Sequence, residues 1–277
     1  MTRYRALCFG EALIDEFPDR RVVAGAPLHV AAHLAALGWE ANLVTRIGDD
    51  EDGRSITAAL ATSGVGLDHV ETDPELPTGT TTITLTESGH GFTVNRPAAW
   101  DAILGPQTTP DVDVVYFGTL AMRDGRSRSA LDRILGRSSA RRVVDLNLRA
   151  PDYDAATVTR AVAEADILKL SDGEWPQVAR LLEIGPSPEA LLTLGPEWVC
   201  LTKGAAGAGL LRRGGGAWSA AAPETGVVDT VGAGDAFCAG LIDGLVGGGD
   251  PDRALVLASA AAASTLGGRG GLPPPTP

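Results

Sequence analysis

The sequence predicts an α/β protein with a mostly parallel sheet, and three observations indicate this class. Short apolar runs, typical of buried strands, alternate with segments of helical periodicity along most of the 277 residues. Glycines and polar residues follow several of these runs, as expected where parallel strands end and ligands bind. A β-rich segment at 78–94 interrupts the alternation and predicts a hairpin outside the main sheet. Because no long linker divides the chain, we expect one domain over residues 1–277.

The individual elements follow from local signals. The apolar run RALCF predicts the first strand and ends in the segment GEALID. Pro27 suits the first turn of a helix, and Gly38 ends that helix. The acidic turn DDEDG favours the start of another helix, because carboxylates stabilise a helix N-terminus. The expected strands are 5–9, 42–47, 80–86, 91–94, 112–117, 142–146, 165–170, 198–202 and 208–211. The expected helices are 28–37, 54–62, 127–137, 154–164, 174–182, 188–193, 236–247 and 251–264.

The hairpin predicted at 78–94 has the pattern of a small β lid. Threonines alternate with aliphatic residues on either side of the turn ESGH, which predicts threonines facing outward and aliphatic residues inward. We expect residues of about 11–24 and 78–97 to form a lid over the ligand edge of the main sheet. Arg96 would then point at a substrate, although a solvated arginine is the alternative. A partner subunit could cover the exposed edges of the lid, so we expect a homodimer.

The composition is that of a globular protein whose ligands are small molecules. The net charge of −12 argues against nucleic acid and anionic membrane surfaces as partners. No run approaches the about 18 apolar residues of a transmembrane helix, and no signal peptide is recognisable at the N-terminus. Three widely spaced cysteines, without a CxxC pair, predict buried thiols in a reducing compartment. We therefore expect a cytoplasmic protein.

The segment DTVGAGDAF at 229–237 carries the strongest chemical signal. It follows an apolar run at 226–228 and precedes a helical pattern, which predicts a strand-to-helix turn. Gly232 and Gly234 let the backbone approach a ligand, and the first N–H groups of a helix bind anions. Asp235 is a carboxylate in this anion-attracting turn, and removal of a proton from an attacking hydroxyl would explain it. A tight turn in which Asp235 merely caps the helix is the alternative.

Polar residues also follow other predicted strands. Asp145, Asn147 and Arg149 alternate with apolar residues and are expected to share a face. Asp15 follows the first strand, where it could meet a polar substrate or be an ordinary surface turn. The remaining candidates are Lys169 and Glu174 after one strand, and Thr202, Gly204 and Gly207 after another. Because the strand ends at Asp145, Lys169 and Thr202 and the turn at 229–237 are expected at one edge of a parallel sheet, these four indicate a single ligand site.

Two histidines, His29 and His33, lie four residues apart on a predicted helix and share a face. Such a pair can bind zinc, but the sequence between them is not the E-x-x of a zinc protease and no third ligand is evident. We therefore prefer a contact between His29 and a substrate.

Taken together, these motifs resemble those of the PfkB/ribokinase family of carbohydrate kinases, most closely its fructokinase-like branch. DTVGAGDAF matches the C-terminal signature of that family, and GEALID and GAP at 25–27 match its N-terminal sugar-site segments. RIGDDEDG at 46–53, DLNLR at 145–149 and KLSDGE at 169–174 also agree, so the resemblance runs almost end to end. It implies a ribokinase-like, three-layer α/β/α fold with a small β lid. It also implies transfer of the γ-phosphoryl group of ATP to a sugar hydroxyl.

The resemblance assigns a role to each candidate residue. Asp235 would be the general base, and the N–H groups of Gly232, Ala233 and Gly234 would hold the developing phosphoryl charge. The residues facing the sugar would be Asp15, Gly25, His29, Arg96 and Arg149. The residues along the phosphates and nucleotide would be Asp145, Asn147, Lys169, Thr202, Gly204 and Gly207. Glu174 would order the water ligands of Mg²⁺, and Asp229 and Val231 would contribute to a monovalent cation site, of the kind that binds K⁺.

The substrate is the part of the function that the sequence leaves open. The family usually has asparagine, a ligand of sugar hydroxyls, where this chain has His29, and usually has glycine in place of Ala24. A fructose-like monosaccharide is the leading expectation. A keto-deoxy sugar acid, a sugar phosphate or a nucleoside are alternatives, and Arg96 and Arg149 would suit an anionic group. A non-catalytic sensor of a sugar or nucleotide is the third hypothesis.

Overall fold

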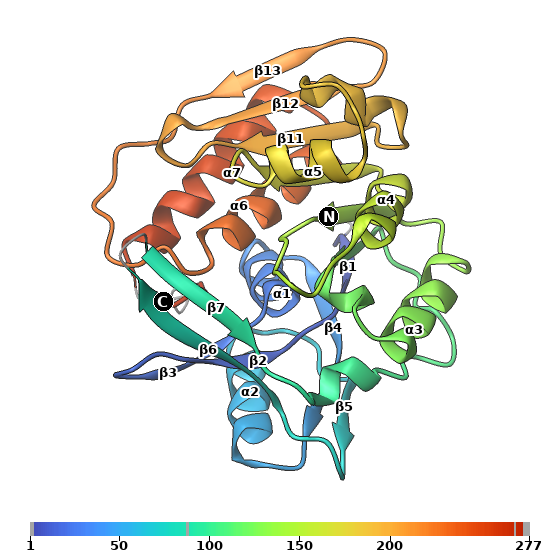
Figure 1. The fold of residues 1–277 in the computed structure, drawn as a ribbon, viewed down its shortest axis with the longest axis vertical. Coiled ribbons are helices and arrows are strands. Elements are labelled where there is room, and N and C mark those ends of the chain that lie inside the picture. The colour runs from blue at the N-terminus through green and yellow to red at the C-terminus, as the bar shows by residue number, and fades with distance from the viewer. Residues whose placement is uncertain (1–2, 87–88, 269, 274–277) are drawn as a thin grey trace.

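A nine-stranded sheet forms the centre of the protein in the computed structural model, which describes residues 3–86, 89–268 and 270–273 (Figure 1). The order of its described strands is β13-β12-β11-β10-β9-β8-β1-β4-β5. All pairs from β11 to β5 are parallel, whereas β12 and β13 pair antiparallel at one edge. The predicted α/β class with a mostly parallel sheet is therefore confirmed.

The strands of this sheet are mostly short apolar runs, because helices cover both of its faces. Their bounds are β1 (Arg5–Phe9), β4 (Glu40–Gly48), β5 (Val70–Asp73), β8 (Val114–Gly118), β9 (Arg141–Asp145), β10 (Ile167–Ser171), β11 (Trp198–Thr202), β12 (Ala208–Arg212) and β13 (Ala217–Ala220). Neighbouring residues of β1 point to opposite faces: Ala6 and Cys8 join one core cluster, and Leu7 and Phe9 join the other.

Two layers of helices enclose the sheet. The first comprises α1 (Ala26–Ala36), α2 (Glu51–Thr62), α6 (Ala233–Ile242) and α7 (Pro251–Leu266), and the second comprises α3 (Gly125–Leu135), α4 (Ala155–Glu164) and α5 (Trp175–Leu181). Short 3-10 segments are η1 (Ala99–Ala102), η2 (Leu120–Met122), η3 (Pro188–Thr193) and η4 (Gly204–Ala206), and η5 (Asp243–Gly248) is a π-helical extension of α6. The three-layer arrangement agrees with the predicted ribokinase-like fold. Among the described residues, no helix has the length and apolarity needed to cross a bilayer.

A second, four-stranded sheet lies beside the main one (Figure 1). Its described strands are β2 (Leu13–Glu16), β3 (Arg21–Ala24), β6 (Gly79–Thr86) and β7 (Gly89–Val94), in the order β3-β2-β6-β7. The predicted hairpin is confirmed as the antiparallel pair β6 and β7, and Glu87 and Ser88 at its turn lie outside the described residues. The expected outward placement of threonines holds for Thr82 and Thr84 but not for Thr81, which is buried with Ile83.

Several local predictions differ from the structure. The strand expected before residue 229 is wrong: Val227 and Val228 are 63% and 61% exposed and belong to a loop, because the sheet already ends at β13. An apolar run forms a strand only where a neighbour pairs with it. The helix expected from 236 begins at Ala233, and the helix expected at 188–193 is a 3-10 segment. The sequence did not predict β5 and β13, which are only four residues long and largely polar or small.

The crossing of α6 and α7 is close, because glycines leave room for backbone contact. A Cβ atom on Gly240 would lie 2.7 Å from the Cα of Ala258. One on Gly244 would lie 2.3 Å from the Cα of Ala254. Since both neighbours are backbone atoms, the helices would have to move apart to admit a methyl group.

We therefore expect Gly244→Ala to lower the free energy of unfolding by about 1–3 kcal/mol through overpacking. Gly248→Ala is the matched control, because nothing lies within 4 Å of the position its Cβ would take. Chemical denaturation of both variants measures the difference. Equal stabilities would contradict the close helix crossing.

Candidate active site

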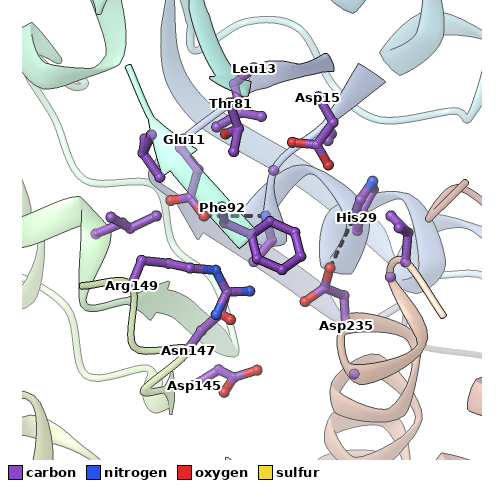
Figure 2. Close-up of a pocket in the computed structure, with 18 of the residues that line it drawn as sticks. Glu11, Leu13, Asp15, His29, Thr81, Phe92, Asp145, Asn147, Arg149 and Asp235 are labelled. Atoms are coloured by element: carbon purple, nitrogen blue, oxygen red, sulfur yellow. Dashed lines mark hydrogen bonds and ion pairs between the residues drawn. The ribbon is translucent and has the colours of Figure 1, made fainter. Parts of the chain in front are cut away.

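A cavity of about 240 Å³, lined by several charged side chains, lies between the main sheet, the small sheet and the starts of α1 and α6 (Figure 2). It is smaller than the roughly 300–1,000 Å³ typical of pockets for drug-sized ligands, so it suits a small molecule. In the view of Figure 2, Asp15, His29 and Asp235 lie on one side, and Glu11, Asn147 and Arg149 on the other. The lining residues are Glu11, Leu13, Asp15, Ala24, Gly25, Ala26, His29, Thr81, Phe92, Val94, Leu120, Asp145, Asn147, Arg149, Lys169, Thr230, Val231, Gly232, Gly234 and Asp235.

Asp235 stands in the first turn of α6 and faces this cavity. The residue that precedes the helix is Gly232, in the left-handed conformation with φ +75°, and no side chain caps the helix. The alternative in which Asp235 is only a helix cap is therefore wrong. A Cβ atom on Gly232 would lie 2.2 Å from the Cα of Gly271, so both the conformation and the packing require glycine here.

His29 contacts Asp235 directly. Its Nδ1 lies 2.8 Å from Oδ2 of Asp235, and the histidine is only 2% exposed. Burial lowers the pKa of His29, but the hydrogen bond and charge of Asp235, together with the charge of Asp15, outweigh burial and raise it. His33, one turn further along α1, instead bonds through Nε2 to the carbonyl oxygen of Gly271, at 3.0 Å. The two rings therefore have different partners.

Two further carboxyl groups are buried at the cavity. Burial raises the pKa of Glu11 to about 7, although the Ala26 N–H group and the charge of Arg149 oppose the rise. Burial likewise raises the pKa of Asp15 to about 6, against the opposing charges of His29 and Arg149. The sequence predicts Asp15 but not Glu11. The signal for Glu11 was a single charged residue between Cys8 and Ile14 in an otherwise apolar segment, since burying a carboxyl group is unfavourable without a reason.

The two arginines expected at the substrate have different positions. Arg149 lines the cavity, and its guanidinium carbon lies 5.4 Å from the centre of the Phe92 ring. Arg96 is not among the lining residues; it is half exposed and pairs with Asp152 at 2.6 Å. Asp152 also pairs with the buried Arg123, at 3.2 Å. The structure therefore brings one guanidinium group, not both, to this cavity.

A buried ion pair lies beside the start of α6. Nζ of Lys169 is 2.6 Å from Oδ2 of Asp145 and would be 3.4 Å from a Cβ on Gly234. Burial raises the pKa of Asp145 to about 6, with Lys169 opposing the rise. Burial works against the charge of Lys169, but the Asp145 carboxylate raises its pKa. At neutral pH the pair is thus ionic, and it places an ammonium group at the turn that opens α6.

Asp145, Asn147 and Arg149 all line the cavity, as the sequence predicts, but not because they share the face of a strand. Strand β9 ends at Asp145, and Asn147 has a positive φ of 40°. The chain turns after Asp145, and this turn directs the next polar side chains to the cavity.

The remaining sequence candidates lie outside the cavity lining. Thr202 is the last residue of β11, Gly204 and Gly207 follow this strand, and Gly207 has a φ of +92° that favours glycine. The carboxylate of Glu174 accepts hydrogen bonds from the N–H of Leu148 at 2.6 Å and from the N–H and hydroxyl of Ser171 at 2.8 and 2.7 Å. It therefore ties the ends of β9 and β10 together.

Asp229 is also bonded within the chain. Its Oδ1 accepts the N–H of Val231 at 3.1 Å, and its Oδ2 accepts the N–H of Gly270 at 3.2 Å. The same Oδ2 lies 3.4 Å from a guanidinium nitrogen of Arg20, in the turn between β2 and β3. This contact joins the small sheet to the segment that leads into α6.

Residues 7–277 match the family model described as pfkB family carbohydrate kinase. The chain belongs to this family. It is accordingly a phosphotransferase that acts on a sugar hydroxyl. The resemblance seen in the motifs is confirmed.

Curated relatives include kinases with different acceptors. The chain is 33% identical to a fructokinase of Klebsiella pneumoniae, covering 90% of this chain and 87% of the relative. It is 28% identical to aminoimidazole riboside kinase of Salmonella typhimurium, covering 93% of this chain and 86% of the relative. It is 31% identical to 2-dehydro-3-deoxygluconokinase of Thermoproteus tenax, covering 90% of this chain and 80% of the relative.

Solved structures share the fold. A fructokinase of Xylella fastidiosa with bound ATP superposes with a TM-score of 0.87 at 22% identity, covering 97% of this chain and 94% of the other. A double mutant of fructokinase from Vibrio cholerae O395, bound to fructose, ADP and potassium ion, superposes with a TM-score of 0.84 at 25% identity, covering 97% and 94%.

The buried Glu11 leads to a prediction about pH. Its pKa rises from an ordinary 4.5 to about 7 in the folded protein, so the folded chain holds more protons than the unfolded chain between these values. The free energy of unfolding should therefore fall as pH rises from 4.5 to 7. Glu11→Gln, which cannot ionise, should gain stability relative to the wild type across this range, by on the order of 3 kcal/mol.

Denaturation of both proteins at pH 4.5 and pH 8 measures this difference. Glu40→Gln, at an exposed carboxyl group, is the control and should show no such trend. A constant difference between Glu11→Gln and the wild type would contradict the raised pKa.

Proposed function

We propose that this chain transfers the γ-phosphoryl group of ATP to a hydroxyl of an uncharged, fructose-like monosaccharide, with Asp235 as the general base. The position of Asp235 carries the proposal: an accessible carboxylate in the first turn of α6, facing a small cavity lined by charged side chains. Helix N-termini attract phosphate, so a carboxylate there stands where an acceptor hydroxyl and a phosphoryl group would meet.

In this mechanism the bond between the sugar oxygen and the γ-phosphorus forms while the bond from that phosphorus to the bridging oxygen of ADP breaks. The hydroxyl proton passes to Asp235. The N–H groups of Gly232, Ala233 and Gly234 would receive the developing phosphoryl charge. Ala233 already donates to the carbonyl of Thr230 at 3.3 Å, so the two glycines are the main donors in the proposal. Lys169 adds positive charge beside them.

The nucleotide belongs beyond the cavity, along the ends of β10 and β11. Thr202, Gly204 and Gly207 would border it, and Asn147 and Lys169 would lie along its phosphates. Bound ATP in the Xylella fastidiosa relative and bound ADP in the Vibrio cholerae relative support this nucleotide. Phosphoryl transfer of this type depends on positioning and charge more than on covalent chemistry by the protein.

The carboxylates near the phosphate path fit a magnesium ion held through water. Glu174 keeps acceptor capacity beyond its three hydrogen bonds, and Oδ1 of Asp145 is buried without a partner among the described residues. Oxygen ligands and retained water are typical of Mg²⁺, which when bound neutralises phosphate charge.

The residues expected at a monovalent cation site fit less well. Both oxygens of Asp229 already accept N–H groups, and the guanidinium of Arg20 lies 3.4 Å away. The chain itself thus supplies positive charge beside Asp229, and the proposed mechanism does not use K⁺.

The charge of the cavity favours a neutral acceptor. Glu11, Asp15 and Asp235 contribute carboxyl groups, and Arg149 contributes a guanidinium group. The other oppositely charged lining residues, Lys169 and Asp145, are paired with each other. A second guanidinium, Arg96, would have favoured a sugar acid or sugar phosphate, but it pairs with Asp152 outside the cavity. Carboxyl groups bind sugar hydroxyls as hydrogen-bond acceptors and repel an anionic substrate.

The small sheet is part of the same proposal, as a lid over the sugar in a single kinase domain. It contributes Leu13, Asp15, Ala24, Thr81, Phe92 and Val94 to the cavity lining. Its edge strands in the described part of the chain, β3 and β7, have no further strand beside them, and a homodimer through the lid would cover one of them.

Replacement of the base tests the mechanism. Asp235→Asn should lower kcat by roughly 10²–10⁴ without loss of fold, because the amide cannot accept the proton. A coupled assay of ADP release, with thermal melting as the control for folding, measures the effect. Turnover near the wild-type rate would overturn the assignment of Asp235.

The two arginines test the position of the sugar. Arg149→Ala should raise the KM for the sugar about tenfold or more, because it removes a charged hydrogen-bond donor from the cavity. Arg96→Ala should have a much smaller effect.

A panel of neutral sugars, a riboside, a sugar acid and a sugar phosphate should give turnover with neutral acceptors. Preference for an anionic acceptor, or a larger effect from Arg96, would contradict the neutral-sugar proposal.

A further inference from the structure

We propose that His29 is a positioning residue for Asp235 and not a ligand of the sugar: its ring holds one carboxylate oxygen so that the other faces the acceptor hydroxyl. This inference rests on the proposed function, in which Asp235 is the base. It assigns to His29 a task that differs from the sugar contact expected from its sequence position.

The start of α1 determines where the His29 ring lies. Gly25 precedes the helix with φ +127°, and a Cβ there would lie 2.4 Å from the carbonyl oxygen of Glu11. The N–H of His29 donates to the carbonyl of Gly25 at 2.9 Å, which closes the first turn. The backbone at His29 is therefore set by a glycine contact that no other residue type would permit.

Gly271 determines how the ring is oriented. A Cβ atom on Gly271 would lie 2.3 Å from Cε1 of His29 and 2.6 Å from both ring nitrogens, so the backbone of Gly271 packs against the ring. The carbonyl of Gly271 is bonded to His33, and its Cα also packs on Gly232 at the start of α6. The ring is thus confined by the same loop that packs against the turn preceding Asp235.

The hydrogen bonds of the ring leave little capacity for a sugar. Nδ1 is engaged with Oδ2 of Asp235 at 2.8 Å and must carry the proton of that bond when the carboxylate is ionised. Nε2 is buried and makes no hydrogen bond within the described part of the chain, although the backbone of Val23 helps to raise the pKa of the ring. A buried, confined nitrogen is a poor ligand for an incoming hydroxyl. The other oxygen of Asp235 is therefore the group that contacts the sugar hydroxyl in this proposal.

The charges around the ring add a second consequence. The titratable and charged groups near it come from several elements, namely Asp235 of α6, Asp15 of β2, His33 of α1, Glu11 before α1 and Arg149 after β9. Burial opposes a charged ring, but the neighbouring aspartates raise the pKa of His29 above 6.5. Below 6.5 the ring is charged and favours the ionised carboxylate. As pH rises through the raised pKa the charge is lost, while the Nδ1 proton and the orientation remain.

Two substitutions separate orientation from charge. Asparagine places an amide nitrogen near the position of Nδ1, so His29→Asn keeps a donor to Asp235 but cannot titrate. Leucine keeps much of the volume and removes the donor. His29→Leu should lower kcat about 10- to 100-fold, since misplacement of a catalytic group by about 1 Å has effects of this size. The sugar KM should change by less than about threefold.

The pH dependence of kcat separates this role from a purely structural one, because replacing a purely structural residue would not shift the profile. His29→Asn should lose less kcat at neutral pH than His29→Leu, because it keeps a donor to Asp235, and the acidic limb of its kcat profile should lie at higher pH than that of the wild type. The matched control is His69→Asn, which removes an imidazole outside the cavity lining and should leave the limb in place. Thermal melting shows whether each variant is folded, and if His29→Leu does not fold, the comparison of His29→Asn with the wild type still decides.

The opposite results are equally specific. A large rise in sugar KM with unchanged kcat in His29→Leu would make His29 a sugar ligand and overturn the proposal, as would superimposable pH profiles for His29→Asn and the wild type. Failure of the proposed function is distinguishable: it would appear as no sugar-dependent ADP release by the wild type, or as full activity of Asp235→Asn. An active wild type and an inactive Asp235→Asn, with His29→Leu fully active, would overturn this inference alone.

Discussion

The hydrogen bond between His29 and Asp235 is the interaction around which the site is arranged. It joins two residues that are 206 positions apart in the chain. A series of glycine contacts supports it: Gly232 packs on Gly271, and Gly271 packs on the ring of His29. Helix α1, the start of α6 and the loop after α7 therefore adopt one mutual arrangement, and a side chain at either glycine would force them apart. The Asp235 carboxylate is oriented by this packing as well as by its own helix.

The site also has to accommodate several buried charges. Glu11 and Asp15 are carboxyl groups in a region of low exposure, and their raised pKa values reflect the unfavourable burial of charge. Asp145 is balanced by Lys169 in a buried pair. Groups of this kind weaken a fold unless they bind something, and perturbed carboxyl groups that face a cavity are typical of functional sites. Their concentration at one end of the parallel sheet agrees with the usual position of ligands in α/β proteins.

Much of the fold follows from the sequence, because its signals are local. The run at 5–9 and the run at 198–202 are strands with the predicted bounds, and the hairpin is where the threonine-rich pattern indicates. The apolar run at 226–228, which is an exposed loop, shows the limit of local prediction. An apolar run does not indicate whether a neighbouring strand exists to pair with it. The short strands β5 and β13 carry little local signal, since their pairing partners rather than their residues define them.

Part of the site can be predicted from the sequence, and the rest depends on tertiary packing. Asp235 and the ends of the parallel strands follow from residue types at expected places. The partner of His29 does not, because the contact depends on how α1 and α6 pack. Likewise, Arg96 and Arg149 are equivalent in the sequence, and only the pairing of Arg96 with Asp152 separates them. Glu11 escapes notice because it lies within a run that otherwise reads as core.

The most direct test of the central claim is a crystal structure of the protein with a neutral sugar acceptor and a non-hydrolysable ATP analogue. We expect one sugar hydroxyl to lie within hydrogen-bond distance of Oδ1 of Asp235 and in line with the γ-phosphorus. In that complex Oδ2 remains bonded to Nδ1 of His29. A complex in which the hydroxyl is bound by His29, with Asp235 turned away from both the sugar and the phosphate, would contradict it.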